Sequence, residues 1–347
     1  MKKAGIITIF GEYNYGNRLQ NYAVQQVLRR QGLDAETIRY IGYDDYAPSI
    51  NSEISKNRLK KFKEFNKYIN FAKETLYKTE ETPKSIKEDY DYIVLGSDQI
   101  WNYTLDKTFS DKAFGSFVPA NKRFSLSASF GINHAPEKNT KFYEMYKDNL
   151  QNMKAISVRE TAGKEIVNKL TGRDDAEVLI DPTMMVDISQ WEKLIKKPES
   201  LKTDKFIIKS FLGDASEEIL KEIDKIAKEN GCEIIDILDN NNPYYDMGPA
   251  EFLYLEKNAF LVATDSFHSC VFSILFSTPF VVFERQDNKL ENMHSRIETL
   301  VEKFDLGHRI FKDKITDEIL SKDYTRVQEL LENERQKANN FLQKALA

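Results

Sequence analysis

The chain has 347 residues, of which 41% are hydrophobic and 12% aromatic, so it is long enough for two folded domains and too aromatic to be disordered. Fifty basic and 55 acidic side chains give a net charge of −5, which excludes a general electrostatic attraction to nucleic acid. Cys232 and Cys270 are too few and too far apart for a disulfide framework or a zinc site. We therefore expect a protein of the reducing cytoplasm.

The first half of the chain alternates between apolar strands and amphipathic helices, the pattern of a parallel sheet covered by helices. A first helix carries Leu19, Val27 and Leu28 on one face and ends at Gly32, which suits a left-handed cap. Further helices are predicted near residues 137–153 and after Arg159. The predicted strands are Ile6–Phe10, Ala35–Ile41, Tyr92–Leu95, Phe124–Phe130, Ala155–Val158 and Val178–Ile180.

A polar, lysine-rich stretch at residues 187–204 interrupts this alternation, and we place a domain boundary there. Further strands are predicted at Phe206–Phe211, Glu233–Leu238, Phe260–Ala263 and Phe280–Phe283, with helices at 216–230, 249–257, from Phe267 and at 291–303. The fold class predicted is α/β, with two doubly wound, Rossmann-like domains facing across a cleft. The domains are residues 1–190, 204–322 and a helical tail, 323–347, that could pack back on the first domain.

We expect no transmembrane segment. The longest apolar run, Cys270–Phe283, is interrupted by Pro279 and three hydroxyl residues and falls short of the ~20 residues that a membrane helix needs. A basic run could approach an anionic membrane surface, but interleaved apolar residues favour an ordinary solvated helix face. Its basic residues are Lys56, Arg58, Lys60, Lys61 and Lys63, and the apolar ones are Leu59, Phe62 and Phe65.

Residues 259–283 combine a strand, a turn and a helix in a way that suggests a site. The strand Phe260–Ala263 leads through Thr264-Asp265-Ser266 to His268, in the first turn of an apolar helix. Open α/β sheets bind ligands at the carboxyl ends of their strands, and a helix N-terminus there offers unpaired N–H groups to an anion. The alternative is that Asp265 and Ser266 only cap the helix and that His268 is a buried structural histidine.

Residues 11–23, GEYNYGNRLQNYA, form a strand-to-helix turn. Gly11 and Gly16 have the spacing of a nucleotide-binding loop, but Asn17-Arg18 stand where that loop requires lysine and serine or threonine. The segment is therefore not an ATP or NAD site by its sequence. Asn14 and Asn17 are suited to cap the helix.

Residues 90–102, YDYIVLGSDQIWN, place polar groups and an aromatic ring after a buried strand. Ser97, Asp98, Gln99 and Asn102 could bridge sugar hydroxyls, and Trp101 could stack on a sugar ring. The alternative makes Trp101 a core residue and Asp98 a helix cap.

Residues 155–163, AISVRETAG, place Arg159 just after a strand. Its forked guanidinium could bind a carboxylate or a phosphate. The alternative is a surface arginine paired with Glu160 or another acid.

Taken together, these segments resemble the polysaccharide pyruvyl transferase family. The matching motifs follow the family's order across roughly residues 5–310. They are YNYGNxLQxYA, GSDQIWN, SASFG at 127–131, SVRE at 157–160, IDPT at 180–183, GPAEFL at 248–253, and TDSFHSxVFSILF ending at Phe276.

The resemblance implies a GT-B type enzyme that uses phosphoenolpyruvate to place a pyruvate ketal on a sugar of a cell-surface polymer or its precursor. It implies a donor-handling role for His268 and for Arg159, and we expect His268 and Asp98 to be the catalytic residues. Some members carry Arg-Leu-His where this chain has Ser266-Phe267-His268, so another arginine would supply the anion contact. The donor side of the second domain would then use Ser266, Ser269, Arg296 and Arg285, and the acceptor side of the first domain Asn14, Tyr15, Asn17, Ser97, Asp98, Gln99, Trp101 and Asn102.

The chemistry of phosphoenolpyruvate fits these residue types. Its carboxylate and phosphate call for about two cationic groups and a helix N-terminus. A histidine, with an ordinary pKa of ~6.5, is suited to exchange protons at neutral pH. Asp98 or Asp265 could orient it or bind acceptor hydroxyls. We expect no metal and no cofactor beyond the co-substrate, and a saccharide or a lipid-linked oligosaccharide as the acceptor.

Two other functions stay open. One is a GT-B glycosyltransferase that uses a nucleotide sugar, although the pair of glutamates with seven residues between them, usual in retaining members, is absent between Phe206 and Phe311. The other is a non-catalytic glycan-binding relative, which the serine at position 266 alone would support.

Overall fold

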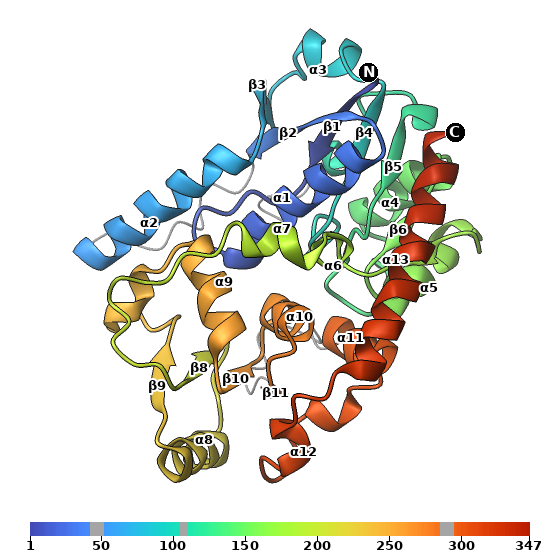
Figure 1. The fold of residues 1–347 in the computed structure, drawn as a ribbon. Helices are drawn as coiled ribbons and strands as arrows, with labels where there is room; N and C mark the ends of the chain where they lie inside the picture. Colours follow the sequence, from blue (N-terminus) through green and yellow to red (C-terminus); the bar gives the residue numbers. More distant parts are fainter. Residues whose placement is uncertain (42–51, 105–109, 285–294) are drawn as a thin grey trace. The chain divides into compact units, whose positions relative to one another are not determined.

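The structure is a computed structural model, and it describes residues 1–41, 52–104, 110–284 and 295–347 (Figure 1). These residues divide into two compact units. The first unit contains residues 1–47, 66–186 and 333–347, and the second contains residues 48–65 and 187–332. In the part of the chain that the structure describes, no helix is long and apolar enough to cross a membrane.

A parallel sheet with the strand order β3-β2-β1-β4-β5 forms the centre of the first unit. Its strands are β1 (Lys3–Ile7), β2 (Asp34–Ile41), β3 (Phe71–Tyr77), β4 (Tyr92–Leu95) and β5 (Arg123–Ser125). Single bridges from Phe124 to Ala155 and from Ala128 to Val158 extend it to a short pair, β6 (Ser157–Val158) and β7 (Glu177–Val178). The helices are α1 (Tyr15–Arg30), α3 (Lys84–Glu88), α4 (Lys141–Gln151), α5 (Thr161–Thr171) and α6 (Pro182–Met185).

The second unit has its own parallel sheet, with the strand order β11-β10-β8-β9. The strands are β8 (Phe206–Ser210), β9 (Glu233–Asp236), β10 (Leu261–Thr264) and β11 (Phe280–Val282). The helices are α2 (Glu53–Phe65), α7 (Ile188–Glu192), α8 (Glu217–Asn230), α9 (Pro249–Asn258), α10 (Phe267–Phe276), α11 (Ser295–Lys303) and α12 (Asp317–Leu320). Helix α13 (Thr325–Leu346) begins in this unit and continues into the first.

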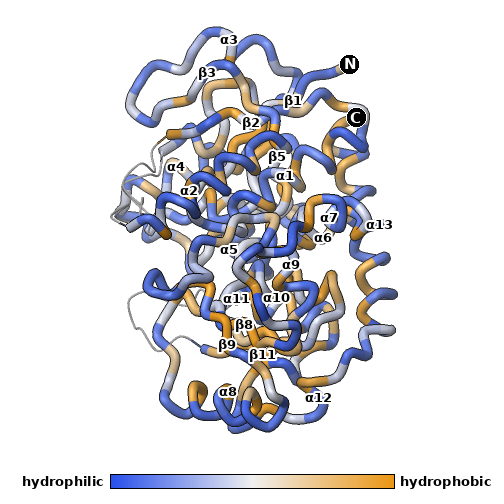
Figure 2. The backbone as a smooth tube through the Cα atoms, turned by 60° about the vertical axis from the view of Figure 1, so that its left-hand side comes forward, coloured by the Kyte–Doolittle hydropathy of each residue, from blue (hydrophilic) through white to orange (hydrophobic). Residues whose placement is uncertain are grey.

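Local sequence explains where the helices begin, end and pack. The Asn14 carboxamide accepts a hydrogen bond from Asn17 N at 3.0 Å and caps α1, and Ser216 caps α8 in the same way. Helix α8 ends at Gly231, whose φ of 64° suits glycine. The isoleucines of α8 face the sheet. In Figure 2 the turns of α8 therefore carry both hydrophobic and hydrophilic segments, whereas the strands beside it are hydrophobic.

The structure confirms the predicted α/β class with parallel sheets. The predicted strand at Phe124–Phe130 is wrong beyond Ser125, because Ser127 adopts a positive φ of 51° that ends the extended backbone. Strand β3 was not predicted, because as an edge strand it exposes Lys73 and Glu74 and has no apolar run.

The observed bounds of the two units differ from the expected domains at α2. The expected domain 1–190 includes this helix, but the structure places it in the second unit, where Arg58 Nη1 donates to Tyr245 O at 2.8 Å. Lys61 also pairs there with Asp246 at 3.2 Å. Two residues of the basic run, Arg58 and Lys61, therefore make contacts within the second unit. The tail contacts the first unit through Arg335, whose Nε donates to Met184 O at 2.8 Å.

Candidate functional site

In each unit the polar motifs follow strands of one parallel sheet, so they gather at the carboxyl edge of that sheet. In the second unit, strand β10 ends at Thr264 and helix α10 begins at Phe267. In the first unit, the motifs follow β1, β4, β5 and β6. We describe the two edges separately and call them the second-unit edge and the first-unit edge.

At the second-unit edge, Asp265 fixes a neighbouring loop. Its buried carboxylate accepts hydrogen bonds from Leu212 N at 2.7 Å and Gly213 N at 2.9 Å, just after β8. Ser266 occupies the N-cap position of α10, but its side chain makes no capping hydrogen bond. Asp265 therefore holds the β8–α8 loop against the start of α10.

His268 lies in the first turn of α10 and is 8% exposed. Its ring meets the ring of Phe267 edge-on, with centroids 5.3 Å apart. The guanidinium carbon of Arg296, in α11, lies 6.0 Å from the centre of the same Phe267 ring. Residues 267–270 include no acidic side chain, so the partial positive charge of the helix N-terminus is not neutralised by its own first turn. The structure thus brings together an imidazole, a guanidinium and a helix N-terminus.

A buried carboxyl group supports α10 from the neighbouring helix. Burial raises the pKa of Glu256 in α9 to about 8, although hydrogen bonds with Ser269 and Ser273 act in the opposite direction. Ser273 Oγ donates to Glu256 Oε2 at 3.1 Å, and Ser269 Oγ lies 3.3 Å from Ser210 Oγ. Ser269, predicted from the sequence as a donor-binding residue, is 1% exposed and contacts the interior. This geometry does not favour a direct contact between Ser269 and a ligand.

At the first-unit edge, Arg159 is the centre of a buried ionic network. Its Nη1 donates to Asp181 Oδ2 at 2.8 Å and its Nη2 to Asp98 Oδ1 at 3.3 Å. The side chain of Arg159 is 1% exposed. Burial alone lowers its pKa, but Asp98 and Asp181, with Glu160 nearby, outweigh burial and raise it. Neither sequence-based expectation holds in full, because the arginine is neither on the surface nor open to a ligand.

Two carboxylates of this network were not among the predicted site residues. Asp181, in the IDPT motif, accepts a hydrogen bond from Ser97 Oγ at 2.7 Å and caps α6 through Thr183 N. Glu160, in the SVRE motif, is fully buried and accepts from Phe130 N at 2.7 Å. In both cases the available signal was an acid just after a strand predicted from the sequence.

The predicted acceptor residues fall into two groups. Asn17 donates through its carboxamide to Asp98, and Asn102 Nδ2 donates to Gln99 Oε1 at 2.8 Å. These residues, together with Asn14 and Ser97, form a continuous polar edge at the ends of β1 and β4.

Trp101 does not belong to that edge. Trp101 is fully buried, stacks on Phe114 at 5.4 Å and donates from Nε1 to Ala113 O at 3.2 Å. The prediction that Trp101 stacks on a sugar ring is therefore wrong, and the core interpretation is correct. Tyr15 lies in α1 and is buried to the same extent as Asp98 of the polar edge. Arg285, the remaining predicted donor residue, lies outside the described residues.

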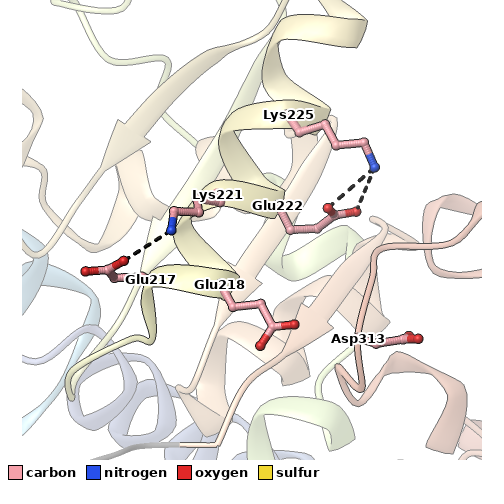
Figure 3. A pocket seen from close by; sticks show the side chains of 6 residues that line it. All are labelled: Glu217, Glu218, Lys221, Glu222, Lys225 and Asp313. Carbon is pink, nitrogen blue, oxygen red and sulfur yellow. Dashed lines mark hydrogen bonds and ion pairs between the residues drawn. The ribbon is translucent and has the colours of Figure 1, made fainter.

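A hollow beside α8 carries no comparable chemistry (Figure 3). Its lining pairs opposite charges along the helix surface, with Lys221 Nζ 3.1 Å from Glu217 and Lys225 Nζ 3.4 Å from Glu222. Such exposed pairs are typical of a solvated helix face.

Comparison with known proteins shows the family and the fold of the chain. The model of a family described as polysaccharide pyruvyl transferase matches residues 14–288. No curated protein matches the chain. Similar solved structures include a putative UDP-N-acetylglucosamine 2-epimerase from Listeria monocytogenes, with a TM-score of 0.54 and 10% identity over 97% of this chain and 90% of that one. MnaA from S. aureus, solved with UDP, has a TM-score of 0.50 and 13% identity over 96% and 89%. UDP-GlcNAc 2-epimerase from Methanocaldococcus jannaschii has a TM-score of 0.50 and 12% identity over 96% and 92%. At these identities the likeness shows the fold, which is of the GT-B type.

Proposed function

Because this chain belongs to the polysaccharide pyruvyl transferase family, we propose that it transfers the enolpyruvyl group of phosphoenolpyruvate to two hydroxyl groups of a sugar, forming a pyruvate ketal and releasing phosphate. The observation that carries this proposal is the second-unit edge, where His268, Arg296 and the N-terminus of α10, whose first turn contains no acidic side chain, lie close to Phe267. An anionic donor is the ligand for which such an edge is suited. The acceptor is a sugar of a polysaccharide or of its precursor.

In the proposed reaction, two C–O bonds form at one carbon and one C–O bond breaks. The methylene carbon of phosphoenolpyruvate takes a proton, and the adjacent carbon becomes an oxocarbenium-like centre. A first sugar hydroxyl attacks this centre and loses its proton. A second hydroxyl then displaces phosphate and closes the ketal, and its proton leaves with the phosphate or a protein base. No electrons are exchanged with a cofactor.

His268 is the group that we assign to proton transfer at the methylene carbon. It is the histidine at the start of α10, and the helix dipole beside it favours the negative charges of the donor. Arg296 supplies a cation near the same helix start, where some family members carry an arginine at the position of Ser266. The Asp265 carboxylate serves this site indirectly, because it fixes Leu212 and Gly213 beside α10.

The first-unit edge is suited to hydroxyl groups. Three carboxylates, from Asp98, Glu160 and Asp181, surround the guanidinium of Arg159, so the charge around Arg159 itself disfavours binding of an anion there. Carboxylates and amides such as Asp98, Asn17 and Gln99 are good partners for sugar hydroxyls. We therefore revise the role of Arg159 from donor binding to positioning of Asp98.

The proposal can be tested by incubating the protein with phosphoenolpyruvate and a panel of saccharide acceptors. We expect stoichiometric release of phosphate and an acceptor whose mass has grown by one pyruvate ketal. In deuterium oxide the ketal methyl group should gain one deuterium, because one of its hydrogens comes from solvent. Product formed with a nucleotide sugar, and none with phosphoenolpyruvate, would replace this function with glycosyl transfer.

The free thiols of Cys232 and Cys270 support a cytoplasmic location for the reaction.

A further inference from the structure

Arg18, at the start of α1 in the first unit, is a buried cation that the proposed reaction does not use. It is 1% exposed, and burial lowers the pKa of its guanidinium to about 10. Nη2 donates to Gly11 O at 3.1 Å. Nε and Nη1 are buried and have no hydrogen-bond partner among the residues that the structure describes. A buried charge in this state is costly, so its presence calls for a reason.

The surroundings of Arg18 do not neutralise it. Glu12 lies near enough to raise the pKa of Arg18, although no ion pair joins the two described side chains. Arg39 lowers the same pKa as a second nearby cation. Arg39 is exposed on β2 and forms no ion pair with any residue in the described ranges. Among the residues that the structure describes, the charged side chains nearest to Arg18 are Glu12 and Arg39, which leaves an excess of positive charge.

Aromatic rings hold both arginines in place. The guanidinium of Arg18 lies 4.1 Å from the centre of the Phe10 ring, and that of Arg39 lies 4.8 Å from the centre of the Phe71 ring. The two rings meet edge-on with their centres 5.3 Å apart. Stacking of this kind orients a guanidinium plane and leaves its N–H groups to bond with an anion.

The same place has the N-terminus of a long helix. Arg18 belongs to the first turn of α1, and its side chain reaches back to Gly11, three residues before the N-cap Asn14. The first turn of this 16-residue helix contains no acidic side chain. A helix start, a buried guanidinium with two unused nitrogens and a second arginine thus occur together.

We propose that Arg18, Arg39 and the N-terminus of α1 form a binding site for a diphosphate group of the acceptor. A diphosphate offers several oxygens, enough to engage both guanidinium groups and the helix start. A bound diphosphate would compete with Gly11 O for Nη2 of Arg18, which donates to that carbonyl in the free protein. Asn17, the residue before Arg18, bonds to Asp98 of the polar edge, so the diphosphate would bind next to the residues that hold the sugar. The role in the acceptor rests on the proposed function, whereas the anion site itself does not.

The binding test uses inorganic pyrophosphate as the probe, on the full chain without phosphoenolpyruvate. We expect calorimetry to show binding to the wild type and a loss of at least about tenfold in affinity for Arg18→Met. Arg39→Met should lose less, because Arg39 is exposed. Arg30→Met removes the same charge from the far end of α1 and should bind like the wild type.

Thermal unfolding of the free protein gives a second readout that a structural role would not produce. If Arg18 serves to bind a ligand, Arg18→Met should raise the Tm of the free protein, because a methionine of similar length removes a buried charge that has no counter-charge. A lowered Tm or a failure to fold would show that Arg18 is structural and would overturn the proposal. Arg18→Lys keeps a charge without the fork and should bind pyrophosphate with intermediate affinity. Wild-type affinity for pyrophosphate in Arg18→Met, or no binding to the wild type at millimolar probe, would overturn it as well.

Two further probes identify the source of the diphosphate. Geranyl diphosphate binding more tightly than pyrophosphate indicates a lipid-linked acceptor, UDP binding more tightly indicates a nucleotide-linked one, and equal affinities assign the site to the diphosphate alone. A failure of pyruvyl transfer with normal, Arg18-dependent pyrophosphate binding would reject the proposed function and keep this site. An unchanged acceptor KM in Arg18→Met would reject the role in the acceptor.

Discussion

The two carboxyl edges of this protein use similar residues for opposite electrostatic purposes. At the first-unit edge, Arg159 is enclosed by carboxylates, and the network has more acids than bases. At the second-unit edge, the Asp265 carboxylate accepts hydrogen bonds from two backbone amides, and His268 and Arg296 lie near a helix whose first turn contains no acidic side chain. An arginine or an aspartate after a strand therefore indicates the carboxyl edge of a sheet. The residues that this side chain contacts decide which group of a substrate can bind at that edge.

The largest expected effect concerns His268. If it transfers the proton to the methylene carbon, His268→Ala should lower kcat by roughly 10²–10⁴-fold, the usual range for the loss of a general acid–base group. His134→Ala, which removes an exposed loop histidine, is the matched control and should keep normal turnover. Steady-state kinetics at saturating acceptor measure both. Near-normal turnover in His268→Ala would remove the histidine from the mechanism.

Arg159→Met tests whether the first-unit edge is held by its ionic network. The substitution leaves Asp98 and Asp181 buried without their cation, so we expect a loss of about 3–5 kcal/mol in the free energy of unfolding. Arg326→Met breaks an exposed pair with Glu329 and should cost at most about 1 kcal/mol. Urea unfolding measures both. If Arg159→Met is as stable as the control, the network is not what holds this edge.

Glu256 predicts a pH dependence at the second-unit edge. Its pKa is about 8 in the folded protein, above the ordinary value of 4.5, so the folded state keeps a proton that the unfolded state releases. The free energy of unfolding should therefore fall as pH rises from about 4.5 to about 8, by at most about 1.4 kcal/mol per pH unit from this group. Glu256→Gln should remove this contribution, and Glu298→Gln, on an exposed face of α11, should retain it. Parallel urea midpoints for the wild type and Glu256→Gln across this range would contradict the burial of a protonated carboxyl.

Asp265→Asn should have a smaller effect on the same edge. An asparagine keeps one acceptor oxygen, so one of the amides of Leu212 and Gly213 loses its partner, at a cost of about 1–3 kcal/mol. Because the loop then moves beside α10, kcat should fall while global folding persists. Asp214→Asn, on the exposed part of the same loop, is the control. Equal kinetics in the two variants would show that Asp265 does not position the site.

Sequence reasoning found the edges but not the pairing within them. The alternation of strands and helices, and the order TDSFH after a buried strand, were enough to predict the fold class and the place of His268. The fate of Trp101 depended on Phe114 and Phe130, which lie apart from it along the chain, so one segment could not show that the ring is enclosed. Arg159 likewise finds Asp98 and Asp181 at distances along the chain of 61 and 22 residues. Long-range pairing of this kind depends on the register of the sheet, which periodicity alone does not predict.

One pair of substitutions tests most directly the claim that the anionic donor binds at the second-unit edge. Ser266→Asp and Asn14→Asp each place one negative charge at the N-cap of a helix, α10 in the second unit and α1 in the first, with a residue that is a good N-cap. The measurement is the calorimetric affinity for phosphoenolpyruvate in the absence of acceptor. We expect Ser266→Asp to weaken the affinity for phosphoenolpyruvate by about tenfold or more and Asn14→Asp to leave it unchanged. The reverse order, with the loss in Asn14→Asp and none in Ser266→Asp, would contradict this claim.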